Sequence, residues 1–156
     1  MAWNHSIFTY NSTMQEMIAA WKYRGDYQIG YIFKQAMIAS YKKRFASMKK
    51  GLVVVPVPLS KERLQERGFN QAQQLADILP RENIAVLERH HGEKQSKKSR
   101  AERIMTENPF ELLYPLNTAA VLVDDIYTTG RTLRHAADLL KRHGCPEVYG
   151  LTLSRS

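Results

Sequence analysis

Apolar and polar positions along the chain fall into stretches that predict strands alternating with helices. Two apolar stretches, residues 52–57 and residues 119–124 with Asp124 at the end, have the length and composition of strands that are buried on both faces. Shorter apolar stretches predict three more strands, at residues 7–10, 84–87 and 148–153. Apolar residues at helical spacing predict helices at about residues 14–21, 27–45, 70–79 and 132–143. This alternation predicts an α/β fold with a mainly parallel central sheet.

The turns after the two buried strands are candidate binding sites, because the carboxyl ends of parallel strands share one rim of the sheet. Residues 121–132 read VLVDDIYTTGRT, so the second run stops at Asp124 and Asp125, and a loop rich in hydroxyls and glycine leads into a helix. Such a loop presents backbone N–H groups and hydroxyls to a phosphate monoester. The two carboxylates can hold vicinal hydroxyls or, together with a ligand, a magnesium ion. The segment therefore predicts a site for a phosphorylated sugar.

More ordinary interpretations of this segment exist. An acidic pair at the end of a parallel strand is commonly structural or solvated, and Thr-Thr-Gly is a common turn. The ordered combination of apolar run, two acids, threonines, glycine and threonine is more specific than either part. No lysine follows the glycine as it does in a P-loop, and no G-x-G-x-x-G opens a strand–helix turn. The sequence therefore disfavours a P-loop and a dinucleotide-binding fingerprint.

The same segment resembles the motif with which type I phosphoribosyltransferases bind 5-phosphoribosyl 1-pyrophosphate (PRPP). The resemblance implies a three-layer α/β fold with a mainly parallel central sheet, and one phosphoribosyltransferase domain over residues 1–156. It also implies that Asp124 and Asp125 contact the ribose hydroxyls and, through bound PRPP, a magnesium ion. The residues that it implies for binding the 5′-phosphate are Thr128, Thr129, Gly130, Arg131 and Thr132.

The turn after the first buried strand is dense with cations. Residues 58–71 read PLSKERLQERGFNQ, a composition that a solvated, charged helix start would also have. In type I phosphoribosyltransferases, the corresponding loop holds the pyrophosphate of PRPP. The resemblance implies this role for Leu59, Ser60 and Lys61. It further implies that Arg63 and Arg67 assist the departure of pyrophosphate, because a leaving group with several negative charges needs nearby donors.

Further patterns resemble the ComF/GntX branch of that family. They are V-P-V-P followed by R-G-F-N-Q at residues 67–71, a K-Y-x-G-D element at residues 22–26, and a spaced pattern formed by Gln95, Arg100, Arg103 and Asn108. The resemblance implies that residues 89–108 form a flexible loop that closes over the ligands and excludes water. It also implies a helical hood over residues 1–50, in which Lys22 and Arg24 point toward the acceptor. ComF/GntX proteins usually carry an N-terminal four-cysteine zinc element, which this sequence lacks, so we expect either a truncated chain or a member without it.

Composition indicates the type of ligand and the location of the protein more than the reaction that it performs. The net charge of +8 favours acidic ligands such as phosphates, pyrophosphate or nucleic acid, without choosing among them. Cys145 is the only cysteine, which excludes an internal disulfide and a cysteine-based zinc site within these 156 residues. No apolar stretch has the length of a membrane span and no secretory signal opens the chain, so we expect a cytoplasmic protein. The family resemblance implies a homodimer.

The sequence leaves three functions open. The first is a transferase that moves the phosphoribosyl group of PRPP to an unidentified acceptor, with Mg²⁺ as cofactor. The second is a module that binds PRPP or a nucleotide as a signal and has lost turnover. The third, suggested by the resemblance to the ComF/GntX branch, is a single-stranded DNA-binding accessory protein of natural transformation, with a basic surface and exposed aromatic residues such as Trp3, Trp21 or Tyr23. The acidic pair and the phosphate loop favour the first two functions, whereas the basic charge is consistent with the third.

Overall fold

The computed structural model describes residues 1–45, 47–48, 51–90 and 108–156. Within these residues, four parallel strands form one sheet in the order β1–β6–β5–β2, and β3 and β4 form a separate antiparallel ribbon. The strands are β1 (Asn4–Thr9), β2 (Val53–Pro56), β3 (Leu87–Arg89), β4 (Phe110–Leu112), β5 (Ala120–Tyr127) and β6 (Val148–Arg155). The helices are α1 (Ser12–Tyr23), α2 (Ile29–Ile32), α3 (Lys34–Phe45), α4 (Lys61–Arg67), α5 (Gln71–Ile78) and α7 (Arg131–Arg142). None of the helices in the described residues is both long and apolar enough to cross a membrane.

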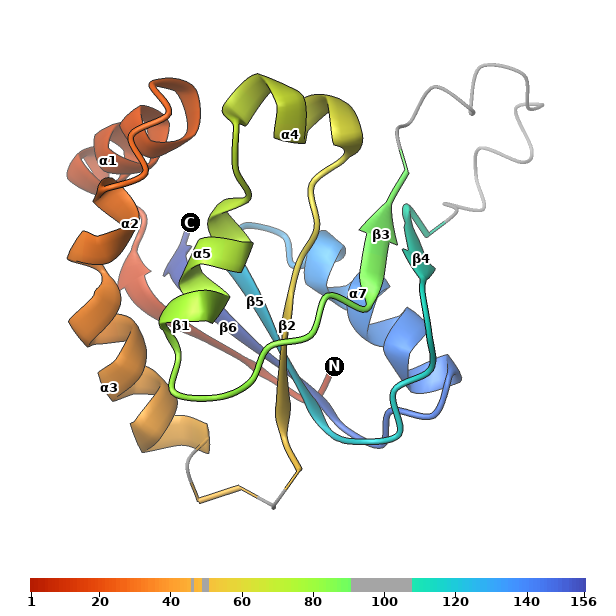
Figure 1. Cartoon of the computed structure of the whole chain (residues 1–156). Helices are drawn as coiled ribbons and strands as arrows, with labels where there is room; N and C mark the ends of the chain where they lie inside the picture. Colours follow the sequence, from red (N-terminus) through yellow and green to blue (C-terminus); the bar gives the residue numbers. More distant parts are fainter. Residues whose placement is uncertain (46, 49–50, 91–107) are drawn as a thin grey trace.

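The sheet lies between two apolar layers, because successive side chains of a strand point to opposite faces. On β5, Val121 and Val123 face a core to which α1, α3 and α5 contribute. Ala120 and Leu122 face a second core, which contains residues of α7 and of the β3–β4 ribbon. Figure 1 shows α1 and α3 on one side of the sheet, α7 on the other, and α4 beyond the strand ends. The predicted α/β fold with three layers and a mainly parallel sheet is confirmed.

β5 extends beyond the end that the apolar run predicted. The apolar residues stop before Asp124, but the strand continues to Tyr127 because β6 runs beside it, with Tyr127 opposite Arg155. On its other edge, the pairing of β5 with β2 ends at Val123. Asp124 and Asp125 therefore lie inside the last part of a strand that has a partner on one edge only, and not after the strand.

Other predicted boundaries are wrong for reasons that lie outside local sequence. The single helix predicted at residues 27–45 is two helices, α2 and α3, separated at Phe33, although the apolar periodicity runs across the break. The strand predicted at residues 84–87 is displaced to β3, because β4 pairs with Leu87–Arg89, whereas the preceding segment meets β2 only through an isolated bridge at Asn83. Periodicity does not predict β4 or α4, since three and seven residues are too few to establish a pattern.

The N-terminal helices are fixed to α5 by one buried glutamine. The indole N–H of Trp21 donates to Gln74 Oε1 at 2.9 Å, and Gln74 Nε2 donates to the Tyr27 carbonyl at 2.7 Å. A Cβ at Gly30 would lie 2.5 Å from Gln74 Nε2, so this close approach requires glycine. α1, α2 and α5 therefore form one packed unit, and this unit sets where the C-terminal end of α1 lies.

Candidate functional site

Asp125 and Lys22 form an ion pair at the C-terminal end of the sheet. Asp125 follows Val123 on the face of β5 that packs toward α1, and Lys22 lies in the last turn of α1. The side chains of the pair are 12% and 14% exposed, and the Ile126 N–H donates to Asp125 Oδ1 at 2.8 Å. The pair connects the acidic end of β5 to α1. Removing either partner would leave the other charge poorly hydrated.

Asp124 has a less favourable environment than Asp125. Burial raises the pKa of Asp124 to about 8, and the neighbouring Asp125 carboxylate acts in the same direction. The Asp125 N–H donates to Asp124 Oδ1 at 2.9 Å, and this contact and the charge of Lys22 lower the pKa without compensating for the burial. A cation placed beside Asp124 would therefore favour its ionised form.

We expect the stability of the protein to fall as pH rises because of Asp124. In the unfolded chain this carboxyl group ionises near pH 4, whereas in the folded protein its pKa is about 8. Between these values the native state binds more protons than the unfolded state. The free energy of unfolding therefore decreases with rising pH, by at most about 1.4 kcal/mol per pH unit. Asp124→Asn should flatten this part of the profile in urea unfolding between about pH 5 and pH 9, and parallel profiles for variant and wild type would contradict the assignment.

The predicted phosphate loop forms a tight turn into α7. It contains Thr128, Thr129, Gly130, Arg131 and Thr132. Gly130 has a φ of 71°, provides no side-chain cap to α7, and packs against the ring of Tyr127. The Arg131 N–H reaches Thr129 Oγ1 only at 3.4 Å. The first turn of α7 thus keeps donor capacity at the end of the helix where an anion is favoured.

The loop after β2 turns directly into α4. Ser60 is the N-cap of this helix, and its side chain accepts from the Arg63 N–H at 3.4 Å. Lys61 pairs with Glu88 of β3: its side chain is 81% exposed, and its Nζ lies 3.1 Å from Glu88 Oε1. Of the three residues predicted to hold pyrophosphate, Leu59 and Ser60 thus form the turn, whereas Lys61 faces the β3–β4 ribbon.

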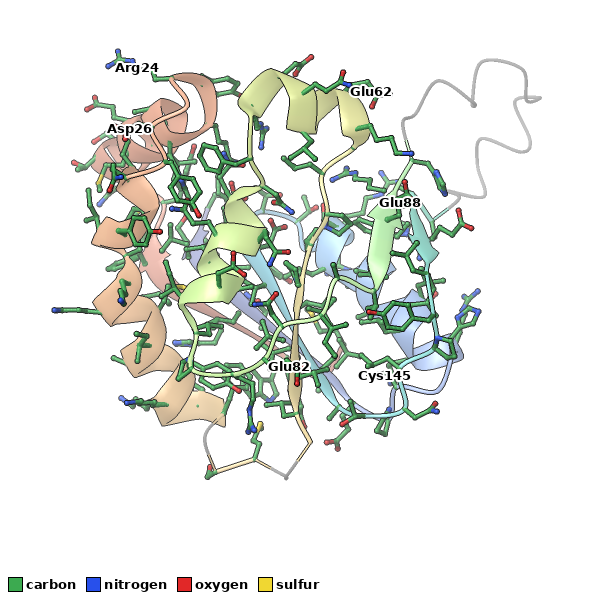
Figure 2. The ribbon with its side chains drawn as sticks, in the orientation of Figure 1. Arg24, Asp26, Glu62, Glu82, Glu88 and Cys145 are labelled. Atoms are coloured by element: carbon green, nitrogen blue, oxygen red, sulfur yellow. The ribbon has the colours of Figure 1, made fainter. Side chains whose placement is uncertain are left out.

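A pocket of about 340 Å³ lies beside the ion pair, between α1 and α4. Its lining residues are Lys22, Tyr23, Glu62, Arg63, Glu66 and Arg67. The Arg67 guanidinium lies 6.0 Å from the centre of the Tyr23 ring and donates to Gln71 Oε1 at 3.3 Å. Gln71 is 2% exposed, and its Nε2 has no hydrogen-bond partner within the described residues. Figure 2 shows the end of α1, marked by Arg24, and α4, marked by Glu62, at the same end of the molecule.

The segment predicted to be a flexible loop is described only at its ends. Gln95, Arg100 and Arg103 lie outside the described residues, so their roles stay predictions. Asn108 binds β4 to α7, because its Nδ2 donates to the His135 carbonyl at 2.6 Å and its Oδ1 accepts from the Phe110 N–H at 3.1 Å.

The structure places two further charged residues beside the acidic pair. Lys22 belongs to the K-Y-x-G-D element, which predicted a role toward the acceptor; in the structure it pairs with Asp125. Arg89, which the sequence grouped with the loop, is the last residue of β3 and interacts electrostatically with Arg63 and Asp124. No local pattern could indicate this position, because its neighbours come from α4 and β5.

The donor set suits a magnesium ion that a ligand brings with it. Among the described residues, no group of three or more His, Cys, Asp or Glu side chains could hold a metal ion. Asp124 and Asp125 provide carboxylate oxygens, which are the ligands that Mg²⁺ prefers. The remaining coordination would come from water and ligand phosphates, the usual arrangement for this ion.

Residues 33–153 match the phosphoribosyl transferase domain family. The match covers α3 through most of β6 and includes both strand-end loops of the site. Together with the parallel sheet and its three layers, it identifies the class: the chain belongs to the phosphoribosyl transferase domain family.

Relatives of this chain are named as competence proteins and DNA utilization proteins. The chain is 43% identical to competence protein ComFC of Bacillus subtilis (strain 168), over 98% of this chain and 64% of that protein. It is 33% identical to competence protein ComFC of Streptococcus pneumoniae, over 97% of this chain and 68% of that protein. It is also 33% identical to the DNA utilization protein YhgH of Escherichia coli (strain K12), over 66% of this chain and 49% of that protein. The resemblance to the ComF branch is confirmed, and the chain spans from about half to about two thirds of these relatives.

Proposed function

We propose that this protein binds PRPP with Mg²⁺ and transfers the phosphoribosyl group to an acceptor, releasing pyrophosphate. The observation that carries the proposal is the position of three groups at one end of the sheet: the acidic pair of β5, the Gly130 turn, and the guanidinium groups of α4. Each group matches one part of PRPP. Carboxylates accept from a ribose diol, a helix N-terminus with hydroxyls binds the 5′-phosphate, and guanidinium groups bind pyrophosphate.

The residues of this chain would act mainly by positioning and electrostatics. A lone pair of the acceptor forms the new bond to C1 while the C1–O bond to pyrophosphate breaks, and the bonding electrons leave with pyrophosphate. Arg63 and Arg67 would stabilise the charge on that oxygen, and Asp124 and Asp125 would fix the ribose. The acceptor releases its proton to solvent. Mg²⁺, when bound with the ligand, neutralises part of the pyrophosphate charge.

Two measurements test the proposal in sequence. Calorimetry should show saturable binding of PRPP in the presence of Mg²⁺. Release of pyrophosphate with a panel of nucleobases and related amines should then identify the acceptor. Binding without turnover for the whole panel would favour a PRPP-sensing module, whereas absence of PRPP binding would exclude both functions.

A second candidate function is binding of single-stranded DNA. The observation that favours it is a group of exposed aromatic side chains on α1, α2 and the turn between them: Tyr23, Tyr27 and Tyr31 are 79%, 41% and 47% exposed. Together with the net charge of +8, they form a candidate surface for base stacking. Two other aromatics contribute less, because Trp21 is fully buried and Trp3 stacks on Phe45 at 5.1 Å. The prediction that Trp21 is an exposed aromatic is therefore wrong.

The DNA-binding function predicts affinity that falls steeply with salt and does not depend on the acidic pair of Asp124 and Asp125. Oligonucleotide binding should weaken from about 50 mM to about 200 mM salt, because the release of counterions from the DNA becomes less favourable as the salt concentration rises. The variant Asp124→Asn/Asp125→Asn should bind the oligonucleotide at least as well as the wild type, since it carries less negative charge. Loss of DNA binding in that variant would show that DNA and PRPP share a site.

A further inference from the structure

Arg89 is held next to the loop after β2 by contacts of both its backbone and its side chain. Its backbone pairs with Ser60 through an isolated parallel bridge. In the β3–β4 ribbon it lies opposite Phe110, and its guanidinium lies 5.5 Å from the centre of that ring. The position of Arg89 is therefore set by residues from two other segments, the loop after β2 and β4.

The charges around Arg89 are predominantly positive. Burial lowers its pKa, the guanidinium groups of Arg63 and Arg67 lower it further, and Asp124 acts in the opposite direction. The guanidinium groups of Arg63, Arg67 and Arg89 thus lie close enough to repel one another. The negative charge that acts on Arg89 is that of Asp124. Like charges brought together in this way disfavour one another unless a polyanion lies between them.

A buried amide adjoins this cluster and lacks a partner. Arg67 can only donate, so its contact with Gln71 fixes Oε1 as the acceptor and leaves Nε2 as a donor. Within the described residues, Gln71 Nε2 donates to no acceptor, although Gln71 is only 2% exposed. The Gln71 amide thus adds an unused donor to a region that already carries several positive charges.

We propose that Arg89 binds the pyrophosphate group of the ligand, together with Arg63 and Arg67. The inference rests on the proposed function, because it takes a diphosphate as the ligand of this cluster. In this assignment the role of Lys61 differs from the predicted pyrophosphate binding, because its exposed ammonium group pairs with Glu88. Arg89 is then a binding residue for the leaving group, carried by β3.

Calorimetry with inorganic pyrophosphate and Mg²⁺ tests this assignment. Arg89→Met keeps a long apolar side chain over Phe110 and removes the charge. It should weaken pyrophosphate binding roughly ten- to a hundredfold and leave the affinity for ribose 5-phosphate unchanged within about twofold. Arg89→Lys should recover part of the loss, since lysine restores the charge without the bidentate fork.

The matched control is Arg81→Met, which removes one positive charge far from the site. Arg81 donates to the Tyr41 hydroxyl at 3.3 Å, and it precedes Glu82, which Figure 2 places at the end of the molecule opposite α4. This control should bind pyrophosphate like the wild type. Pyrophosphate affinity unchanged in Arg89→Met would overturn the assignment, and so would an equal loss for pyrophosphate and ribose 5-phosphate. A wild type that binds neither ligand would refute the proposed function itself.

Discussion

The double variant Asp124→Asn/Asp125→Asn is expected to lose PRPP binding, with an affinity at least about a hundredfold weaker than that of the wild type. Asparagine preserves the shape of each side chain but offers one acceptor oxygen and no negative charge. The ribose hydroxyls lose their charged acceptors, and a magnesium ion carried by the ligand loses its carboxylate ligands. Calorimetric titration with PRPP and Mg²⁺ measures the effect, and an unchanged affinity would remove the acidic pair from the site.

Two controls separate this loss of binding from a loss of folding. Asp125→Asn leaves Lys22 without its charged partner, and breaking a buried pair on one side commonly costs about 3–5 kcal/mol. The variant Asp125→Asn/Lys22→Met removes both charges of the pair. Its free energy of unfolding should be closer to that of the wild type than is the value for Asp125→Asn alone. Asp138→Asn makes the same substitution at an exposed ion pair with Arg142 and should leave PRPP affinity unaltered.

Gly130→Ala is expected to have the largest effect on stability among single substitutions at the phosphate loop. The backbone of Gly130 has a φ of 71°, which costs an alanine about 1–2 kcal/mol. The added Cβ would also collide with the Tyr127 hydroxyl and lie 2.5 Å from Cζ of the same ring. The Arg155 guanidinium lies 5.3 Å from the centre of the Tyr127 ring, and Tyr127 is the last residue of β5, so the ring cannot move freely. We expect a total loss of about 2–4 kcal/mol in urea unfolding, together with weaker binding of ribose 5-phosphate.

Gly25→Ala is the matched control for this substitution. Gly25 has a φ of 68°, nearly that of Gly130, but a Cβ there would meet nothing within 4 Å. Its substitution should therefore cost only the backbone contribution of about 1–2 kcal/mol. Equal costs for the two variants would show that the contact with Tyr127 does not constrain the loop.

The turn at Gly130 and its place between β5 and α7 could be predicted from local sequence. The apolar run, the acidic pair and the threonine-glycine turn all lie within residues 121–132, and each reports chemistry that neighbours in the chain supply. The same holds for the alternation of strands and helices, because the period of apolar positions reflects local geometry. The second loop was harder to interpret, since a charged turn and the first turn of α4 have the same composition.

The electrostatic arrangement of the site could not be predicted in this way. β5 extends through Asp125 because β6 supplies hydrogen-bonding partners there, and strand pairing depends on residues far away in the sequence. The contact between Lys22 and Asp125 joins residues about a hundred positions apart, and it depends on how Gln74 fixes α1 against α5. The position of Arg89 depends on its pairing with Ser60.

The sequence by itself thus determined most of the order of strands and helices, though not β4, α4 or the break between α2 and α3, together with the family motif and the chemical types present at the strand ends. Only the tertiary structure decided which charges neutralise each other and which are left in excess. The physical reason is that helical and strand periodicity are set by neighbours in the chain, whereas pKa values and ion pairs are set by burial and by charges that folding brings together. The raised pKa of Asp124 and the positive charge around Arg89 are properties of that second kind.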